Sequence, residues 1–202
     1  VGLRFIFNDK VILGALTLDM IAVLFGGAVA IFAVFAKDVL GAGSQGFGIL
    51  NASLSLGSIL TMLATTHMPI TKNTGKKLLI AVFGFGIAMI VFGASKLFIL
   101  SIVALFVAGI FDGISMVIRQ TILQLKTPDE MRGRVGAINA MFVGSSNELG
   151  ALESGVAAKI FGAPLAVVLG GTVTLLTALT IGAKNDSLRT LDLTKELQEH
   201  ES

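Results

Sequence analysis

The chain has 202 residues, of which 54% are hydrophobic and only 14% are charged, and its mean hydropathy is +0.89. A soluble domain carries about 25% charged residues, so this composition argues against a soluble protein and indicates a membrane protein. The sequence has no Cys, which excludes a disulfide framework, a thiolate nucleophile and a Cys-type zinc site, and the net charge of +2 is too small to indicate nucleic-acid binding.

Six apolar stretches, each about long enough to cross a bilayer, fill most of the chain. They cover residues 11–36, 47–68, 78–94, 97–125, 135–161 and 164–183. About 20 residues of α-helix cross a hydrocarbon core of ~30 Å, and a helix satisfies its own backbone hydrogen bonds in lipid. The sequence therefore predicts an all-α membrane protein with a six-helix transmembrane bundle in residues 1–187. Residues 188–202, in which four leucines stand among charges, are expected to form a cytoplasmic tail, a short amphipathic surface helix that frays rather than a domain.

The basic residues concentrate in alternate connections between these spans. The second-to-third connection carries Lys72, Lys76 and Lys77, whereas Lys37, Lys96 and Lys159 each stand alone in other connections. A second basic cluster surrounds the fourth-to-fifth connection and contains Arg119, Lys126, Arg132 and Arg134. The positive-inside rule then places both termini and the two basic loops in the cytoplasm. Because the chain opens at Val1 without a methionine, we expect it to be a piece of a longer protein.

The fourth-to-fifth connection contains a helix-start signal at residues 127–130. Thr127 is expected to act as the N-cap, Pro128 to occupy the first helical position, and Glu130 to reach back to the cap. We expect a new helix to begin there and to lead into the fifth span.

Five polar side chains within the spans are candidates for a transport pathway. Charges near the middle of a membrane cost from ~2.5 kcal/mol upward, so they usually face a bundle interior or an aqueous cavity. The candidates are Asp19 in the first span, Asp112 and Arg119 in the fourth, and Asn147 and Glu148 in the fifth. Asp112 and Arg119 are seven residues apart, which places them on one helical stripe, and Gly109 and Gly113 allow close contact with another helix.

Simpler structural roles are open for several of these residues. Arg119 is close enough to the cytoplasmic end for its guanidinium to snorkel to the surface. Asn147 fits a role in helix association, Glu153 and Lys159 fit interfacial positions, and His67 fits a solvated helix end. The motifs of common soluble enzymes and of nucleotide-binding loops are absent, so we expect no enzyme activity, no cofactor and no metal site.

Residues 127–155, TPDEMRGRVGAINAMFVGSSNELGALESG, resemble the major facilitator superfamily. The similarity is to its bacterial branch of enterobactin exporters and macrolide efflux pumps, in which a proline-acid-x-x-Arg-Gly-Arg connection precedes a helix with Asn-x-x-Phe and Ser-Asn-Glu-Leu-Gly. Further matches lie at Leu18-Asp19, at residues 35–41 and at Arg119-Gln120-Thr121. The resemblance extends over essentially the whole chain.

This resemblance implies the carboxy-terminal six-helix half of a twelve-helix transporter, built as a 3+3 inverted repeat. It places Asp19, Asp112 and Arg119 on a central cavity, and Glu148 at the edge of the interface between the halves. It also implies two groups of cytoplasmic gate residues: Gly75, Lys76 and Lys77 in one loop, and Asp129, Arg132, Gly133 and Arg134 in the other. The first loop departs from the family pattern, because the acid that would bond to a neighbouring helix is missing.

The leading hypothesis is a proton-coupled exporter of an amphipathic small molecule, working by alternating access in a bacterial inner membrane. The expected partners are the amino-terminal six-helix half, the lipid bilayer and the small-molecule substrate. One alternative is a flippase for lipid-like substrates. Another is a six-helix module that does not transport and self-associates, for example as a homodimer.

Overall fold

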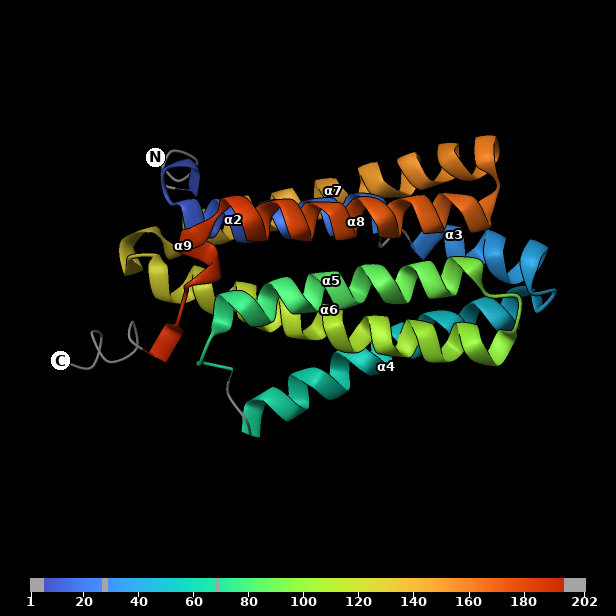
Figure 1. The fold of residues 1–202 in the computed structure, drawn as a ribbon, viewed down its shortest axis with the longest axis horizontal. Helices are drawn as coiled ribbons and strands as arrows, with labels where there is room; N and C mark the ends of the chain where they lie inside the picture. Colours follow the sequence, from blue (N-terminus) through green and yellow to red (C-terminus); the bar gives the residue numbers. More distant parts are fainter. Residues whose placement is uncertain (1–5, 27–28, 68–69, 195–202) are drawn as a thin grey trace.

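The computed structural model describes residues 6–26, 29–67 and 70–194, and in these ranges the chain forms helices and turns without a β-strand. Long helices run side by side to form one elongated bundle (Figure 1). The elements are α2 (Lys10–Ile21), η1 (Ala22–Gly26), α3 (Val29–Val34), η2 (Phe35–Val39), α4 (Gly43–His67), α5 (Thr74–Ala94), α6 (Phe98–Lys126), η3 (Asp129–Met131), α7 (Arg132–Phe161), α8 (Ala163–Lys184) and α9 (Asp186–Arg189).

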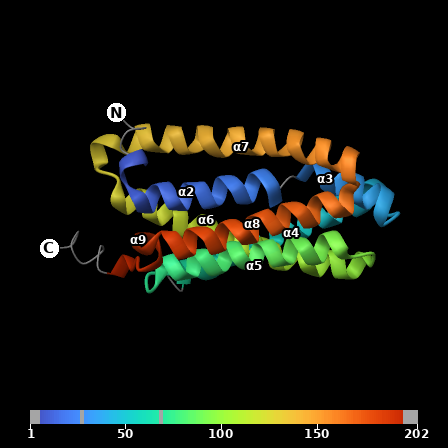
Figure 2. The ribbon, with the colours of Figure 1, turned by 45° about the horizontal axis from the view of Figure 1, so that its top comes forward.

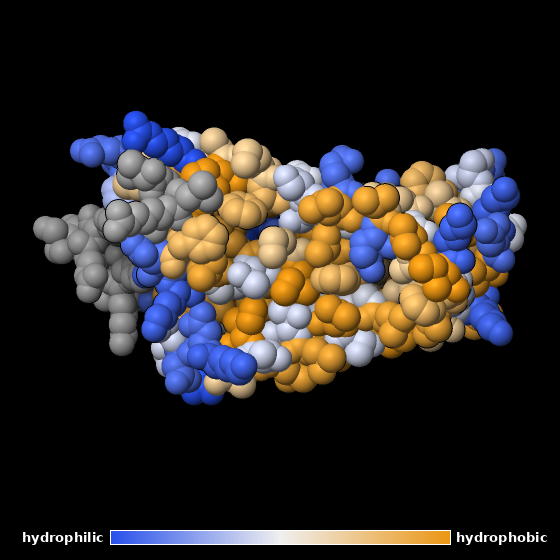
Figure 3. Space-filling view, turned by 90° about the horizontal axis from the view of Figure 1, so that it is seen from above, coloured by the Kyte–Doolittle hydropathy of each residue, from blue (hydrophilic) through white to orange (hydrophobic). Residues whose placement is uncertain are grey.

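Five helical segments in the described residues are long and apolar enough to cross a membrane. They are Lys10–Val39, Gly43–His67, Thr74–Ala94, Phe98–Lys126 and Ala163–Lys184, and they correspond to five of the six predicted spans. Figure 3 shows one face of the bundle, where an apolar middle lies between two hydrophilic ends.

The remaining predicted span lies in α7, which has 30 residues but is more polar than the others. Its inward face carries Asn139, Ser146 and Ser154, whereas Leu152 and Ile160 are exposed. A helix with polar groups turned inward and apolar groups turned outward fits an environment of lipid. The crossing of the membrane by α7 stays a prediction.

The first predicted span is not one uniform α-helix. The α-helical hydrogen bonding of α2 ends at Ile21 and is followed by a wider π-helical turn, η1. The chain continues beyond residues 27–28 in α3 and in a second π-helical turn, η2. Such wide turns are frequent at functional sites, and η1 begins three residues after Asp19.

The helices pack around α5 and α6. α5 lies between α6 and α8, α4 crosses α6, and α7 lies along η1 and α8 at the edge of the bundle (Figure 2). At the α4–α6 crossing the two backbones touch, because a Cβ on Gly109 would overlap the carbonyl oxygen of Leu54. Gly57 lies against the carbonyl oxygen of Phe106 in the same way. The predicted close contact through Gly109 and Gly113 is confirmed.

The predicted capping box at residues 127–130 is wrong. Thr127 has the extended backbone that an N-cap adopts (φ −99°, ψ 121°), but Pro128 is not helical (φ −55°, ψ 146°). The Thr127 side chain is buried and its hydroxyl lacks a hydrogen-bond partner within the described residues. Asp129–Met131 forms a single 3-10 turn, and α7 begins only at Arg132.

The described part of the tail is docked on the bundle rather than lying free on the surface. Within the described residues, α9 ends at Arg189 and helical structure begins again at Leu193, while Leu188, Leu191 and Leu193 are buried against the bundle. The backbone amide of Gly75 donates to the carbonyl oxygen of Leu191 (3.2 Å), and that of Leu193 donates to Thr71 (3.1 Å). The tail is therefore fixed to the connection between α4 and α5. Leu197 and Lys195 lie outside the described residues.

Candidate functional site: a polar cavity beside α2 and α6

A cavity of about 180 Å³ lies where η1, α4, α5, α6 and α7 converge beside α2. Ionisable and polar side chains of Asp19, Asp112, Arg119 and Asn147 line it, together with apolar ones that include Phe85, Phe111 and Met116. Asp112 lies midway along α6, so the cavity lies at the depth that was expected for a transport pathway. The structure thus brings together four of the five candidate residues.

Arg119 and Asp19 form an ion pair that links α6 to α2. Only 4% of the Arg119 side chain and 10% of the Asp19 side chain are exposed. Removing one partner of such a buried pair leaves an uncompensated charge, which typically costs 3–5 kcal/mol. The snorkelling interpretation of Arg119 is wrong, because its guanidinium points into the bundle toward an acid on another helix.

The Arg119 guanidinium has spare hydrogen-bonding capacity. Its Nε is buried and has no hydrogen-bond partner within the described ranges. A guanidinium carries five N–H donors, so one carboxylate does not satisfy it. Arg119 therefore holds Asp19 with donor capacity left over at the edge of the cavity.

Asp112 lies half-buried and is bonded to α4 rather than to the ion pair. The Ser58 hydroxyl lies 3.2 Å from Oδ2 of Asp112 and 3.0 Å from the carbonyl oxygen of Gly109. A hydroxyl has one proton to donate, so an ionised Asp112 and the Gly109 carbonyl compete for it. Ser58 was not identified from the sequence. The available signal was its position next to Gly57. The helix face with Gly109 and Gly113 needs a partner helix, and a small residue such as Gly57 marks one.

Asn147 and Glu148 are neighbours in sequence but face different directions. Both side chains are exposed, but Asn147 lines the mouth of the cavity and Glu148 does not line it. Successive residues of an α-helix are rotated by about 100°, so adjacent positions rarely share a surface. The structure places Glu148 outside the cavity, on the outward part of α7.

The expected gate residues lie around the starts of α5 and α7, at the opposite end of the bundle from η2 and the end of α7 (Figure 1). Lys76 and Lys77 are exposed at the start of α5, while Gly75 is buried under the tail, where a Cβ would overlap the carbonyl oxygen of Leu188. At the start of α7, Arg132 pairs with Asp129 at 2.9 Å. Gly133 and Arg134 are exposed there.

The loop with Gly75, Lys76 and Lys77 lacks the acid of the family pattern, but the tail supplies a carboxylate to it. A carboxylate oxygen of Asp192 accepts from the backbone amide of Asn73 at 3.3 Å. The loop is thus held by a carboxylate from the end of the chain and by the two backbone bonds of the tail. Sequence analysis missed this contact, because the two segments are distant in the sequence.

The sequence matches the profile of the transmembrane secretion effector family, part of the major facilitator superfamily, over residues 1–200. The chain belongs to this family. It is an all-α, multi-pass membrane protein, as the family and the five apolar helical segments both indicate.

Curated relatives include enterobactin exporters. The chain is 24% identical to the enterobactin exporter of Escherichia coli O1:K1 over 137 residues, which cover 68% of this chain and 33% of the relative. It is 26% identical to that of Shigella flexneri, with 68% and 32% coverage. The chain thus spans about a third of the length of the curated relatives it matches.

Proposed function

We propose that this chain is the carboxy-terminal six-helix half of a secondary transporter that exports an amphipathic small molecule in exchange for protons. The observation that carries the proposal is the grouping of Asp19, Asp112 and Arg119 around one cavity between apolar helices. Ionisable groups at such a depth are costly and are typical of substrate and proton pathways. The names of the relatives support export as the direction of transport.

The proton-binding group in this proposal is Asp112. Asp19 is already paired with Arg119, so those two charges compensate each other. If Asp112 takes up a proton, its hydroxyl can donate to Ser58 Oγ, and Ser58 can then donate to the carbonyl oxygen of Gly109. Protonation thereby removes the competition for the Ser58 proton and the charge of Asp112. The loss of the charge and the new hydrogen bond each change the free energy of the state that is closed to water relative to the open state.

The partner in this proposal is an amino-terminal six-helix half. The outward part of α7 offers a surface for it, since Gly133, Gly144 and Gly155 have open space where a Cβ would lie. Small residues allow two membrane helices to approach closely. The greater length of the relatives also supports a second half. The two halves would rock about the cavity in a bacterial inner membrane, with the basic loops in the cytoplasm.

The test is transport by the complete protein in proteoliposomes, with and without a proton gradient. The substrate class is screened with amphipathic compounds, because the cavity combines aromatic surface with the polar side chains of Asp112 and Asn147. Efflux that accelerates when the gradient is imposed, and proton uptake that accompanies it, would support the proposal. Gradient-independent flux, or no flux of any amphipathic compound, would contradict it. The 202-residue chain alone, reconstituted at the same density, is the matched control and is expected not to transport.

A further inference from the structure

An apolar groove on the outside of the bundle lies between α5 and α8. It has a volume of about 430 Å³ and is lined by Leu79, Ile80, Phe83, Ala178, Leu179 and Gly182. Ile80 and Leu179 are 63% and 57% exposed, so the groove opens to the surface that the apolar belt presents to lipid. Gly182 keeps it open, because a longer side chain there would meet Leu79 and fill the space.

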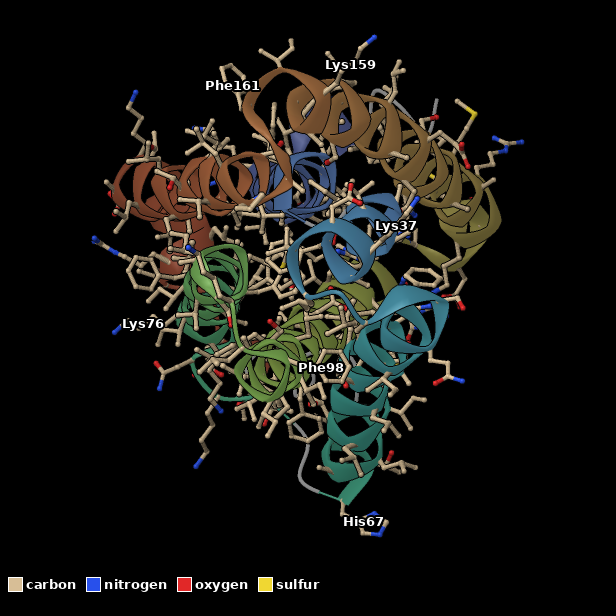
Figure 4. All side chains as sticks on the ribbon, turned by 90° about the vertical axis from the view of Figure 1, so that its right-hand side faces the viewer. Lys37, His67, Lys76, Phe98, Lys159 and Phe161 are labelled. Atoms are coloured by element: carbon tan, nitrogen blue, oxygen red, sulfur yellow. The ribbon has the colours of Figure 1, made fainter. Side chains whose placement is uncertain are left out.

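Two cationic side chains complete the groove at one end. Lys76 comes from the first turn of α5, and Arg189 comes from α9, which follows α8. Lys76 is exposed and projects away from the bundle axis (Figure 4), and Arg189 is exposed although it also contacts Asp186 at 2.8 Å. Lys72 and Lys77 add further positive charge to the same connection.

We propose that this groove binds an anionic phospholipid, with one acyl chain between α5 and α8 and the phosphate held by Lys76 and Arg189. An acyl chain matches the apolar walls, and a phosphate matches two cations at the end of an apolar helix, the level at which headgroups lie. A zwitterionic lipid would satisfy the walls equally well but would gain less from the two cations. This site is separate from the cavity of the proposed transport function and does not depend on it.

The bound lipid would also join two parts of the chain. Lys76 follows Gly75, the residue whose amide is bonded to the tail, and Arg189 belongs to the short helix that begins the tail. A phosphate between them would add a further connection beside the two backbone bonds and the Asn73–Asp192 bond that link the tail to the α4–α5 connection. The lipid would therefore stabilise the tail in its docked position.

Native mass spectrometry of the purified chain in detergent tests the proposal. Phosphatidylglycerol and phosphatidylcholine with identical acyl chains are titrated separately. Each cation near an anionic group contributes ~1 kcal/mol, or about fivefold in affinity. We expect Lys76→Gln to weaken phosphatidylglycerol binding about fivefold and the Lys76→Gln/Arg189→Gln double variant about 30-fold, with a smaller loss for phosphatidylcholine in each variant. Gly182→Leu, which fills the groove, is expected to weaken both lipids.

The matched control is the Lys37→Gln/Lys159→Gln double variant, which removes two exposed cations, in η2 and the last turn of α7, at the other end of the bundle (Figure 1). It is expected to bind phosphatidylglycerol like the unmodified chain. Equal affinity for the two lipids, or an equal loss in the control and in the Lys76→Gln/Arg189→Gln variant, would overturn the proposal. Lys76→Gln changes only an exposed side chain, so its result does not depend on refolding of the tail.

Discussion

Arg119 of α6 reaches across the bundle to Asp19 of α2, and the ion pair that they form is almost fully buried. The pair has no net charge, and it fixes the two helices that contribute the ionisable groups of the cavity. Asp112 lies on the same cavity but is bonded to Ser58 of α4 instead. The site therefore separates a compensated pair from a single acid whose charge is free to change.

The first prediction concerns the energy of this pair. Asp19→Asn and Arg119→Gln are each expected to destabilise the chain by about 3–5 kcal/mol, because each leaves one buried charge without its partner. The Asp19→Asn/Arg119→Gln double variant leaves no charge and is expected to lose much less than the sum. Thermal unfolding of the four proteins in detergent measures the coupling. Additive losses would mean that the two side chains do not interact.

Asp112→Asn is expected to abolish the gradient-driven component of export by the complete transporter while leaving its unfolding midpoint little changed. The amide keeps the shape of the carboxyl group and its bond to Ser58, but it cannot take up or release a proton. Transport in proteoliposomes with an imposed pH gradient gives the result, and exchange without a gradient shows whether substrate still binds.

The matched control for Asp112 is Glu148→Gln, which neutralises an acid outside the cavity. It is expected to retain gradient-driven export. If Asp112→Asn folds and transports normally, Asp112 has a structural role, and Asp19 becomes the next candidate for the proton site.

Adding a Cβ at the centre of the α4–α6 crossing is expected to destabilise the chain. Gly57→Ala would push a methyl group into the carbonyl oxygen of Phe106, and overpacking of this kind typically costs 1–3 kcal/mol. Gly144→Ala, on the open side of α7, is expected to be neutral or to stabilise the chain by up to ~1 kcal/mol. Equal unfolding midpoints for the two variants would show that α4 and α6 are not in backbone contact.

Cysteine labelling tests the orientation, since the chain has no native Cys. Single cysteines at Lys76 and Arg132 are expected to be protected from an impermeant thiol reagent in intact cells, and those at Lys37, Lys96 and Lys159 to react. η2 and the end of α7 lie at one end of the bundle, and the start of α5 lies at the other, as this pattern requires (Figure 1). Labelling of the Lys76 and Arg132 positions from outside would show that the predicted orientation is wrong. Lys195, also expected in the cytoplasm, lies outside the described residues.

The docked tail is expected to depend on Leu193, which is fully buried. Leu193→Ala removes a buried side chain, a change that costs about 2–5 kcal/mol in a packed core. Here it is expected to destabilise the contact between the tail and the bundle. Limited proteolysis is then expected to cleave the tail faster in Leu193→Ala than in the control Leu179→Ala, whose side chain is exposed. Equal cleavage rates would contradict the docked position of the tail.

The sequence by itself determined that this is an all-α membrane protein, because only helices satisfy the backbone of such long apolar stretches in lipid. It also singled out Asp19, Asp112 and Arg119, because charges in apolar helices are costly enough to mark a site. It predicted the close approach at Gly109 and Gly113, because small residues have a local steric effect that does not depend on the partner.

Tertiary structure alone decided which of these groups meet. The pairing of Asp19 with Arg119 and of Asp112 with Ser58 depends on how each helix is rotated about its axis and where it crosses its neighbour. The same rotation turns Asn147 into the cavity and Glu148 out of it. The docking of the tail on the α4–α5 connection joins segments more than a hundred residues apart. Periodicity defines a face of one helix, but the partner of that face is fixed only when all the helices pack together.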